Sequence, residues 1–287
     1  MTTLDMILLS LIGGVGLYLT YRMTVSLEYK WNWGIIPQYL FRYDTEEQRW
    51  VPNLLMQGFL TTIRLSVWST ILATVLGTIA GIFRLSPSFF KRLIGRTYVE
   101  LVRNIPPLVL VFLFYFFLGD QLMMALGVDD FVRKSSEHTQ ALLALFFAPP
   151  ARFSAFLSAV ITLALYEGAY ITEIIRAGIQ SIEKGQWEAS YALGLSWWQQ
   201  MRYIVLPQAI QRILPALAGQ FISAIKDSAI VSIISIQELT FQGLELMAAT
   251  YLTFEVWMTI TVLYFVLTGA CSLAVRRLEM YVQNRTT

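Results

Sequence analysis

The sequence predicts an all-α integral membrane protein with about six transmembrane helices. Of its 287 residues, 56% are hydrophobic and 14% are charged, whereas a soluble domain carries about 25% charged residues. Several apolar runs reach the roughly 20 residues that a helix needs to cross a bilayer. Between two of these runs lies a polar stretch, residues 182–211, whose pattern predicts two short helices in a loop. These observations indicate a multi-pass protein with one ordered loop.

Charge and reactive residues exclude several classes of function. A net charge of +2 without a basic run gives no sign of nucleic-acid binding. The single cysteine, Cys271, lies in an apolar run, so a disulfide framework is excluded. The single histidine, His138, makes no metal site by itself. No metal site and no covalent chemistry are predicted on this chain, and we expect it not to be an enzyme.

The predicted spans follow one another with two mixed-charge segments between them. The first apolar run could be a signal peptide, but it lacks a basic start and a clear cleavage site, so a retained helix is favoured. A Gly77-x-x-x-Gly81 spacing in the second span permits close helix contact, and Pro106-Pro107 interrupts the third. The predicted spans are residues 4–19, 53–83, 98–126, 153–175, 213–236 and 254–275.

Basic residues without matching acids orient these spans. They cluster at 84–96, around the stretch 182–211 and in the tail after residue 275, and alternating spans place all three clusters on one side. The positive-inside rule makes that side the cytoplasm, with both termini inside. The aromatic, mixed-charge segments 21–52 and 127–152 are then external.

The polar stretch carries the turn chemistry of a structured loop. Glu188, Ala189 and Ser190 begin one short helix, and Gly194 can end it because glycine accepts the left-handed conformation there. Ser196 and Gln199 fit a capping box that starts a second helix, which Leu206-Pro207 should stop. A loop as ordered as this between spans is typical of a docking surface.

This loop resembles the EAA loop of permease subunits of bacterial ABC importers. The matching residues are Glu188, Ala189, Ser190, Gly194, Ile204, Leu206 and Pro207. The flanks 165–196 and 206–239 are similar to the polar amino-acid uptake branch, and the likeness covers about residues 51–277. Ser190 and Glu183 are mild departures from the family pattern. The predicted parts are an N-terminal helix with an external segment (1–52), a transmembrane domain (53–277) and a cytoplasmic tail (278–287).

The resemblance implies a type I importer core of five helices, to which the first helix is an addition. The loop would be a cytoplasmic coupling helix that docks on a separate ATPase subunit. The chain has no phosphate-binding loop, so no cofactor is expected on it, and ATP and Mg belong to the partner. Further expected partners are a periplasmic amino-acid-binding protein, a second permease subunit (identical or a paralogue) and lipid of the bacterial inner membrane.

Polar residues inside the spans are candidates for the substrate path, because they are costly unless they face a cavity or a partner. The proline break after Arg103 and Asn104 exposes a helix N-terminus that can receive a carboxylate. Glu167 could meet an ammonium group. The candidates are Arg64, Arg103, Asn104, Glu167, Lys226 and Asp227. The alternative is intramembrane pairing that fixes helix packing, and Glu173 with Arg176 is simply a local pair.

Two other functions compete with an importer permease for amino acids. A secondary transporter or channel would account for the intramembrane charges but gives no reason for a structured cytoplasmic loop, and no internal repeat is visible. A permease that imports another solute, such as a peptide, would carry the same kind of loop. Only the resemblance of the flanking segments argues against this function. Acidic, basic and amide amino acids all fit a path with both charge signs.

Overall fold

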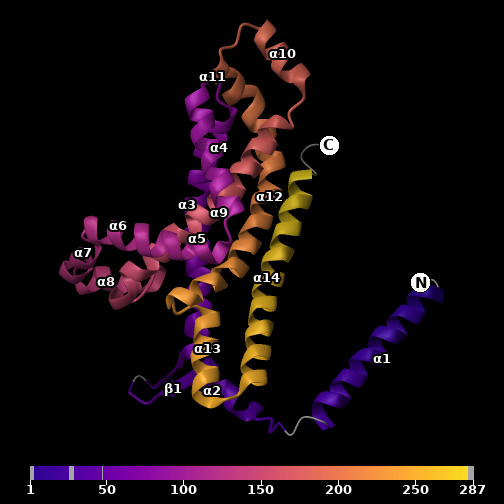
Figure 1. The fold of residues 1–287 in the computed structure, drawn as a ribbon, viewed down its shortest axis with the longest axis vertical. Helices are drawn as coiled ribbons and strands as arrows, with labels where there is room; N and C mark the ends of the chain where they lie inside the picture. Colours follow the sequence, from indigo (N-terminus) through magenta and orange to yellow (C-terminus); the bar gives the residue numbers. More distant parts are fainter. Residues whose placement is uncertain (1–2, 26–28, 47, 284–287) are drawn as a thin grey trace.

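The computed structural model describes residues 3–25, 29–46 and 48–283. Most long helices run along one axis, and the loop 182–211 lies at one end of the molecule, here called the loop end (Figure 1). A two-stranded hairpin lies at the opposite end, here called the hairpin end. The elements are α1 (Thr3–Val25), η1 (Trp33–Ile35), α2 (Ile36–Leu40), β1 (Phe41–Asp44), β2 (Arg49–Pro52), α3 (Leu54–Leu85), α4 (Phe89–Asn104), α5 (Pro107–Leu113), η2 (Phe114–Gly119), α6 (Asp120–Ala125), α7 (Val128–Lys134), α8 (Glu137–Phe146), η3 (Pro150–Arg152), α9 (Phe153–Gln180), α10 (Lys184–Ala192), α11 (Trp197–Gln199), η4 (Gln200–Val205), α12 (Leu206–Asp227), η5 (Ser228–Ile234), α13 (Leu239–Thr250) and α14 (Thr253–Gln283).

The predicted helical membrane protein is confirmed. Among the described residues, five helical stretches are long and apolar enough to cross a membrane: 54–85, 107–125, 150–180, 197–234 and 253–277. The additional helix α1 is apolar over Thr3–Tyr18 and lies apart from the others (Figure 1). Its leucines, such as Leu11 and Leu17, are exposed, as lipid-facing side chains would be in the absence of a bilayer.

Three boundaries differ from the sequence prediction. The predicted interruption at Pro106-Pro107 is present, but residues 98–104 belong to the separate helix α4, which ends at Asn104, and α5 starts at Pro107. Leu206-Pro207 does not stop a helix: Pro207 lies in the first turn of α12, where a missing N–H costs nothing. The π-helical segment η4 leads directly into that turn. Helix α14 continues to Gln283, so the predicted tail is helical up to that residue, and 284–287 lie outside the described residues.

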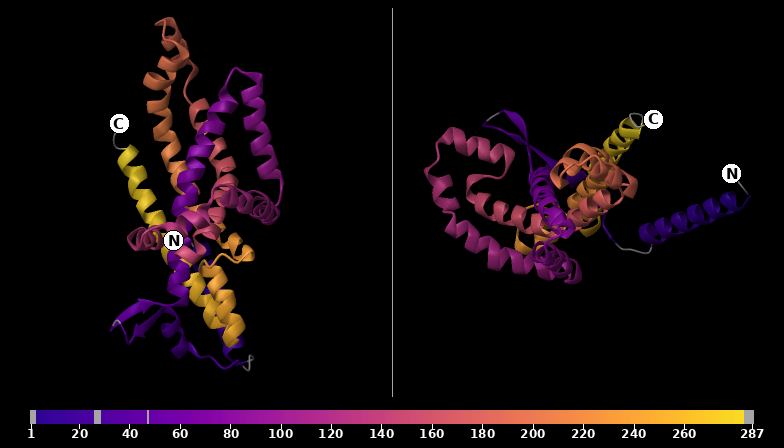
Figure 2. Two further views of the ribbon diagram at one scale, coloured as in Figure 1. Left: turned by 90° about the vertical axis from the view of Figure 1, so that its left-hand side faces the viewer. Right: turned by 90° about the horizontal axis from the view of Figure 1, so that it is seen from above.

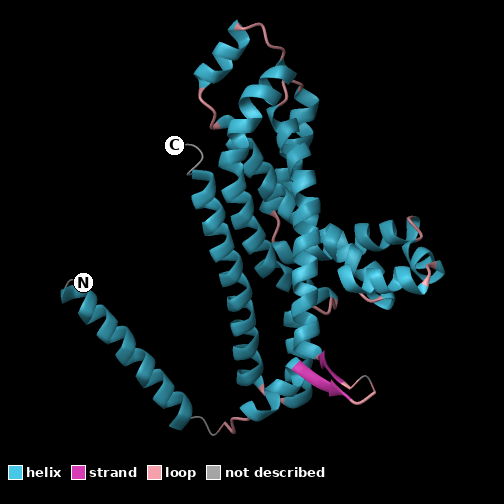
Figure 3. Cartoon of the chain, turned by 180° about the vertical axis from the view of Figure 1, so that it is seen from behind, coloured by secondary structure: helices cyan, strands magenta, loops and turns pink. Residues whose placement is uncertain are grey.

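After the proline break the chain turns sideways. Helices α6, α7 and α8 form a lateral arm (residues 120–146) beside the bundle (Figure 1; Figure 3). The arm returns to α3 at Trp68, whose indole N–H donates to the carbonyl of Phe146 at 2.9 Å. The Trp68 ring also stacks on Phe147, with 4.5 Å between ring centroids. Tryptophan with a buried ring and a satisfied N–H is a common anchor at a membrane interface.

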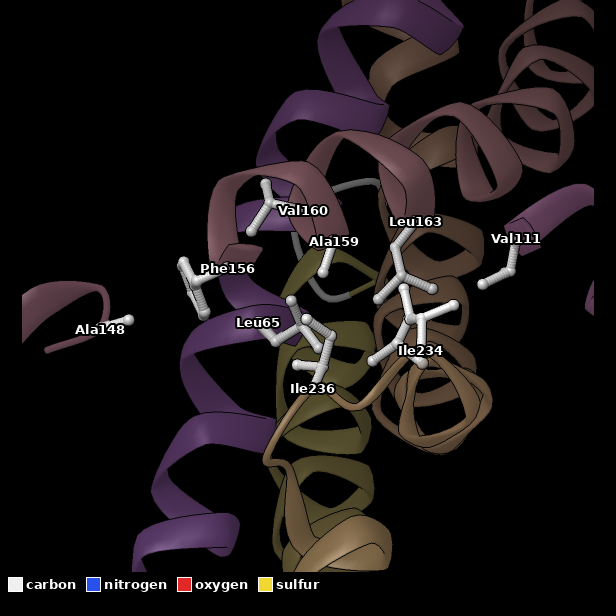
Figure 4. Close-up of a cluster of buried hydrophobic side chains, with 10 residues drawn as sticks. Leu65, Val111, Ala148, Phe156, Ala159, Val160, Leu163, Ile234 and Ile236 are labelled. Atoms are coloured by element: carbon white, nitrogen blue, oxygen red, sulfur yellow. The ribbon is translucent and has the colours of Figure 1, made fainter. Parts of the chain in front are cut away.

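Helices α3 and α9 pack closely along their length and form the centre of the bundle. A Cβ atom built on Gly77 would lie 2.6 Å from Cγ2 of Ile171, and one on Gly81 would lie 2.9 Å from Cγ2 of Ile175. The close contact predicted from the Gly-x-x-x-Gly spacing is therefore confirmed. Further toward the hairpin end, a cluster of buried apolar residues joins these helices to α5 and η5; it includes Leu65, Val111, Leu163 and Ile234 (Figure 4).

The hairpin end is built by segments far apart in the sequence. Strands β1 and β2 pair antiparallel, with Arg42 opposite Val51, and they add a small sheet to the predicted all-α fold. The chain before them contacts the start of α14: the Tyr29 hydroxyl donates to the carboxylate of Glu255, and the backbone N–H of Asn32 donates to the same carboxylate at 2.7 Å. Because Glu255 is fully buried, these bonds attach the N-terminal segment to the core.

A second buried carboxylate, Glu238, lies between the last two predicted spans. It accepts hydrogen bonds from the backbone N–H groups of Thr240 and Phe241, each at 2.8 Å, and thereby caps helix α13. The Tyr264 hydroxyl donates to it at 2.9 Å. Burial raises the pKa of Glu238 to about 7, although these hydrogen bonds lower it in part.

We expect the raised pKa of Glu238 to make stability fall with rising pH. The folded state holds a proton on Glu238 up to about pH 7, whereas the ordinary pKa of this group is 4.5. The contribution to the free energy of unfolding is therefore full below about pH 4.5 and is lost as the pH rises to about 7. By linkage it is on the order of 3 kcal/mol. This contribution is measured by thermal unfolding of wild type and of Glu238→Gln at pH values from 4.5 to 8. If stability depends on pH equally in the two proteins, the prediction is wrong.

Candidate functional site

The loop at the loop end folds nearly as its turn chemistry predicts. Helix α10 begins at Lys184, one turn earlier than the predicted start at Glu188. Gly194 follows the helix with φ = 73°, and its N–H donates to the carbonyl of Tyr191 at 2.9 Å. The capping box is present, since the N–H of Ser196 donates to the side-chain oxygen of Gln199 at 2.8 Å. The loop therefore has a defined shape of its own.

The side chains of the loop divide into exposed and buried ones. Glu188, Ala189, Gly194 and Pro207 are exposed, and Ile204 and Leu206 are half-buried. Ser190, by contrast, is buried, and its hydroxyl donates to the carbonyl of Trp187 at 2.8 Å. A small residue is needed at this position because the helix face packs inward there.

Large apolar side chains at the tip of the loop point to solvent. The exposed fractions are 78% for Tyr191, 77% for Leu193 and 73% for Trp198. Exposed aromatic side chains such as Tyr191 and Trp198 are typical anchors of protein interfaces, whereas no signal in the sequence indicates that Leu193 faces outward. Trp187 and Trp197 instead line a cavity of about 440 Å³ between α10 and the bundle, which Glu188 also borders.

Contacts with the bundle hold the base of the loop. The guanidinium of Arg212 donates to the carbonyl of Ser181, and the side-chain amide of Gln208 donates to that of Gln186 at 3.4 Å. The side view on the left of Figure 2 shows the loop that carries α10 and α11 projecting beyond the α3–α4 turn. The loop is thus an exposed projection on a fixed base.

Glu167 lies at the centre of α9 and is fully buried. The side-chain amide of Gln220 on α12 donates to one of its oxygens at 2.5 Å. The other oxygen, Oε1, has no hydrogen-bond partner within the part of the chain that the structure describes. Sequence reasoning missed Gln220, because an amide in an amphipathic helix is ordinarily taken for a solvated residue. An incompletely satisfied carboxyl group can receive a donor from a ligand.

Of the other predicted path residues, Asp227 on α12 interacts with the carboxyl group of Glu167, whereas the rest lie elsewhere. Arg103 lies over the ring of Tyr170, one turn from Glu167, with 5.4 Å from its Cζ to the ring centroid. Asn104 is occupied locally, because its amide donates to the carbonyl of Glu100 at 2.8 Å. Lys226 is exposed and Asp227 half-buried.

Arg64 lies apart from the others, toward the hairpin end of α3, where it borders a different cavity. The predicted local pair of Glu173 and Arg176 is confirmed, with 2.8 Å between the charged atoms. The structure extends this pair, because Arg84 from α3 also contacts the Glu173 carboxylate. A contact between α3 and α9 cannot be read from the local sequence. This cluster joins two helices and supports packing.

The family model described as "Binding-protein-dependent transport system inner membrane component" matches residues 73–286. The glutamine transport system permease protein GlnP of Escherichia coli (strain K12) is 34% identical over 226 residues, which cover 79% of this chain and 91% of that protein. The glutamate/aspartate import permease protein GltJ of the same strain is 31% identical over 253 residues, covering 88% and 95%.

Comparison with solved structures leads to the same class of transporter. A chain from the crystal structure of an amino acid ABC transporter with histidines matches with a TM-score of 0.67 and 30% identity, covering 88% of this chain and 100% of that one. An inward-facing MetNI methionine ABC transporter, at 19% identity and a TM-score of 0.60, shares the fold. The prediction of a helical importer permease is confirmed. This chain belongs to the binding-protein-dependent transport system inner membrane components, and it is a permease subunit of an amino-acid ABC importer.

Proposed function

We propose that this permease moves its amino acid when a separate ATPase subunit docks on the loop 182–211 and changes shape with ATP. The observation that carries this proposal is the surface of the loop. Glu188 is an exposed charge without a partner among the described residues, and Tyr191, Leu193 and Trp198 are exposed apolar anchors beside it. Aromatic anchors at the centre of an interface contribute most of its binding free energy.

ATP and Mg bind the partner in this scheme, and the permease responds. The ATPase biases the permease between two states only through its different contacts with each state. Because the base of the loop is fixed to α12 through Arg212 and Gln208, a displacement of the loop is transmitted to the helix that carries Gln220. That helix and α9 share the Glu167 carboxyl group, so their relative movement changes access to it.

In this proposal the path runs past Glu167, and Arg103 and the proline break border it. The unmatched oxygen of Glu167 is an acceptor for the ammonium group that every amino acid carries. Asp227 on α12 interacts with the same Glu167 carboxyl group, and the neighbouring Lys226 is exposed. Five core spans enclose too little space for a path, so a second permease subunit completes it. A periplasmic binding protein delivers the substrate; the relatives' names include glutamine and glutamate/aspartate.

The positions of the chain ends and of the basic residues support an orientation of the permease in the membrane. The N-terminal end of α1 and the C-terminal end of α14 both point toward the loop end (Figure 1). Basic residues also outnumber acidic ones at this end, on α4 and around the loop. The loop end is therefore cytoplasmic in this proposal, with both termini inside and the hairpin end outside.

ATP hydrolysis in proteoliposomes tests the proposed function. The permease is reconstituted with its ATPase and binding protein, and hydrolysis and uptake are measured with glutamine, glutamate, aspartate, arginine and histidine. We expect at least one loaded binding protein to stimulate hydrolysis and ATP-dependent uptake together. Uptake by the permease alone, without ATPase or ATP, would contradict the proposal and favour a secondary transporter.

A further inference from the structure

A polar cavity of about 440 Å³ opens at the hairpin end, remote from Glu167 and from the coupling loop. Strand β1, the start of α3, the turn η3 and the beginning of α13 each contribute lining residues. Two of its charged residues, Arg42 and Arg64, precede residue 73, where the family model begins. The cavity therefore combines these residues with Arg152, Gln237 and Gln242, which lie within the family model.

Three guanidinium groups line this cavity: Arg42 from β1, Arg64 from α3 and Arg152 from η3. None of the three forms a side-chain hydrogen bond or ion pair with another residue in the ranges that the structure describes. Asp44 is the single acidic residue of the lining, so three positive charges face one negative charge. The cavity thus favours an anion.

The nearby carboxylate of Glu238 does not offset this positive charge at close range. It does not line the cavity, and its oxygens accept from two backbone N–H groups of α13 and from the Tyr264 hydroxyl. Guanidinium groups bind carboxylates in a planar, two-bond geometry. A ligand with carboxylate groups therefore matches the cavity better than a neutral one.

The cavity also contains a buried acceptor without a donor. Gln242 lines it and is 2% exposed. The side-chain nitrogen of Gln242 donates to Gln237 at 3.4 Å, whereas its oxygen has no partner among the described residues. The side chain is held in place by close packing, since a Cβ atom on Gly58 would lie 2.8 Å from Cγ of Gln242. A buried amide oxygen of this kind accepts a hydrogen bond from an ammonium group.

We propose that this cavity is an entry site for an acidic amino acid on the external face of the permease. The guanidinium groups receive its two carboxylates, and the side-chain oxygen of Gln242 receives its ammonium group. An acidic amino acid carries a net charge of −1 and offers both kinds of group. An amide amino acid lacks the second carboxylate, and a basic one is repelled by the arginines. The inference rests on the proposed function, because it names the substrate class of that transporter.

Direct binding tests this site without transport. The complex of permease and ATPase in lipid nanodiscs, without ATP and without binding protein, is titrated calorimetrically with L-glutamate, L-aspartate, L-glutamine and L-arginine. We expect the acidic amino acids to bind at least about tenfold more tightly than glutamine, a factor typical of one lost charged hydrogen-bond pair. Arginine should not bind. Arg64→Gln and Arg152→Gln should each weaken glutamate binding by about tenfold and should weaken glutamine binding less, because glutamine offers one carboxylate in place of two.

Control variants separate this effect from misfolding. Arg64→Lys keeps the charge and should bind glutamate within about threefold of wild type, since only the planar geometry is lost. Arg133→Gln removes an exposed arginine of the lateral arm, which pairs with Asp130, and should change nothing. Equal affinity for glutamate and glutamine would overturn the inference, as would cavity variants that behave like Arg133→Gln. If sulfate competes for the cavity as strongly as glutamate does, the cavity is a general anion site. This outcome would also overturn the inference.

Uptake assays distinguish failure of this inference from failure of the proposed function. ATP-driven uptake of a neutral or basic amino acid that the cavity variants leave unaltered would overturn the acidic-substrate site while the proposed function stands. If the cavity variants weaken only the docking of the binding protein, the arginines recognise a protein surface and the inference is wrong. Glutamate binding without ATP-dependent uptake of any amino acid would support the site and contradict the proposed function.

Discussion

Replacing Gly77 with valine is expected to abolish most of the folded permease. A Cβ atom at this position would lie 2.6 Å and 2.8 Å from side-chain atoms of Ile171, and 2.9 Å from the backbone oxygen of Gly168. The side chain of Ile171 can shift, but the backbone of α9 cannot do so without separating the two central helices. Overpacking typically costs about 1–3 kcal/mol and occasionally more, and a clash with backbone lies at the upper end of that range. The folded fraction is measured by size-exclusion chromatography and thermal unfolding in detergent.

Gly219 provides the matched control for this prediction. It lies inside α12, and a Cβ atom built on it has nothing within 4 Å. Gly219→Val therefore adds the same side chain to a helix without a clash, and we expect wild-type yield. The double variant Gly77→Val, Ile171→Ala should recover part of the loss, since the side-chain clash is removed and only the backbone oxygen remains. Equal yields for the two valine variants would show that α3 and α9 need not pack this closely.

Reversing the charge at Glu188 is expected to uncouple the transporter without unfolding it. Glu188 is exposed on α10, and no hydrogen bond or ion pair joins it to another residue in the described ranges. Glu188→Arg should therefore leave the thermal unfolding midpoint unchanged. At an interface, a like-charge juxtaposition costs several kcal/mol. In the proposed docking we expect binding-protein-stimulated ATP hydrolysis to fall by at least about tenfold.

The control for this variant is an acidic residue at the other end of the molecule. Glu245 is exposed on α13 near the hairpin end, and Glu245→Arg makes the same change in net charge. It should leave the stimulation of hydrolysis by the binding protein unchanged. If Glu188→Arg also preserves stimulation, Glu188 does not contact the ATPase, and the exposed Tyr191 and Trp198 become the remaining candidates for the docking surface.

Much of the membrane architecture could be predicted from the sequence because the bilayer acts on each segment separately. A span must be apolar over about 20 residues and must satisfy its backbone groups within its own helix. Both conditions are local. The shape of the coupling loop was local as well: Gly194 adopts the left-handed conformation that its position predicts, and Ser196 and Gln199 form their capping box. The proline break after Asn104 was likewise visible in the chain.

Residues that depend on distant partners could not be predicted in the same way. Gln220 meets Glu167 across 53 positions of sequence, and Ser190 faces inward because of how α10 rests on its neighbours. Pro207 was expected to end a helix, yet the preceding π-helical turn lets it begin one. In each case the residue type permits two outcomes of similar local energy, and packing decides between them.

Local sequence patterns were sufficient to predict the class of protein, its spans, its family resemblance and the loop that identifies it. Which polar side chains meet depends on how the helices pack. Arg42, Arg64 and Arg152 look in sequence like three unrelated arginines, and in the fold they line one cavity with Asp44 and Gln242. Hydropathy and turn chemistry act over a few neighbouring residues, whereas a binding site depends on contacts between helices, which are fixed only when the chain packs.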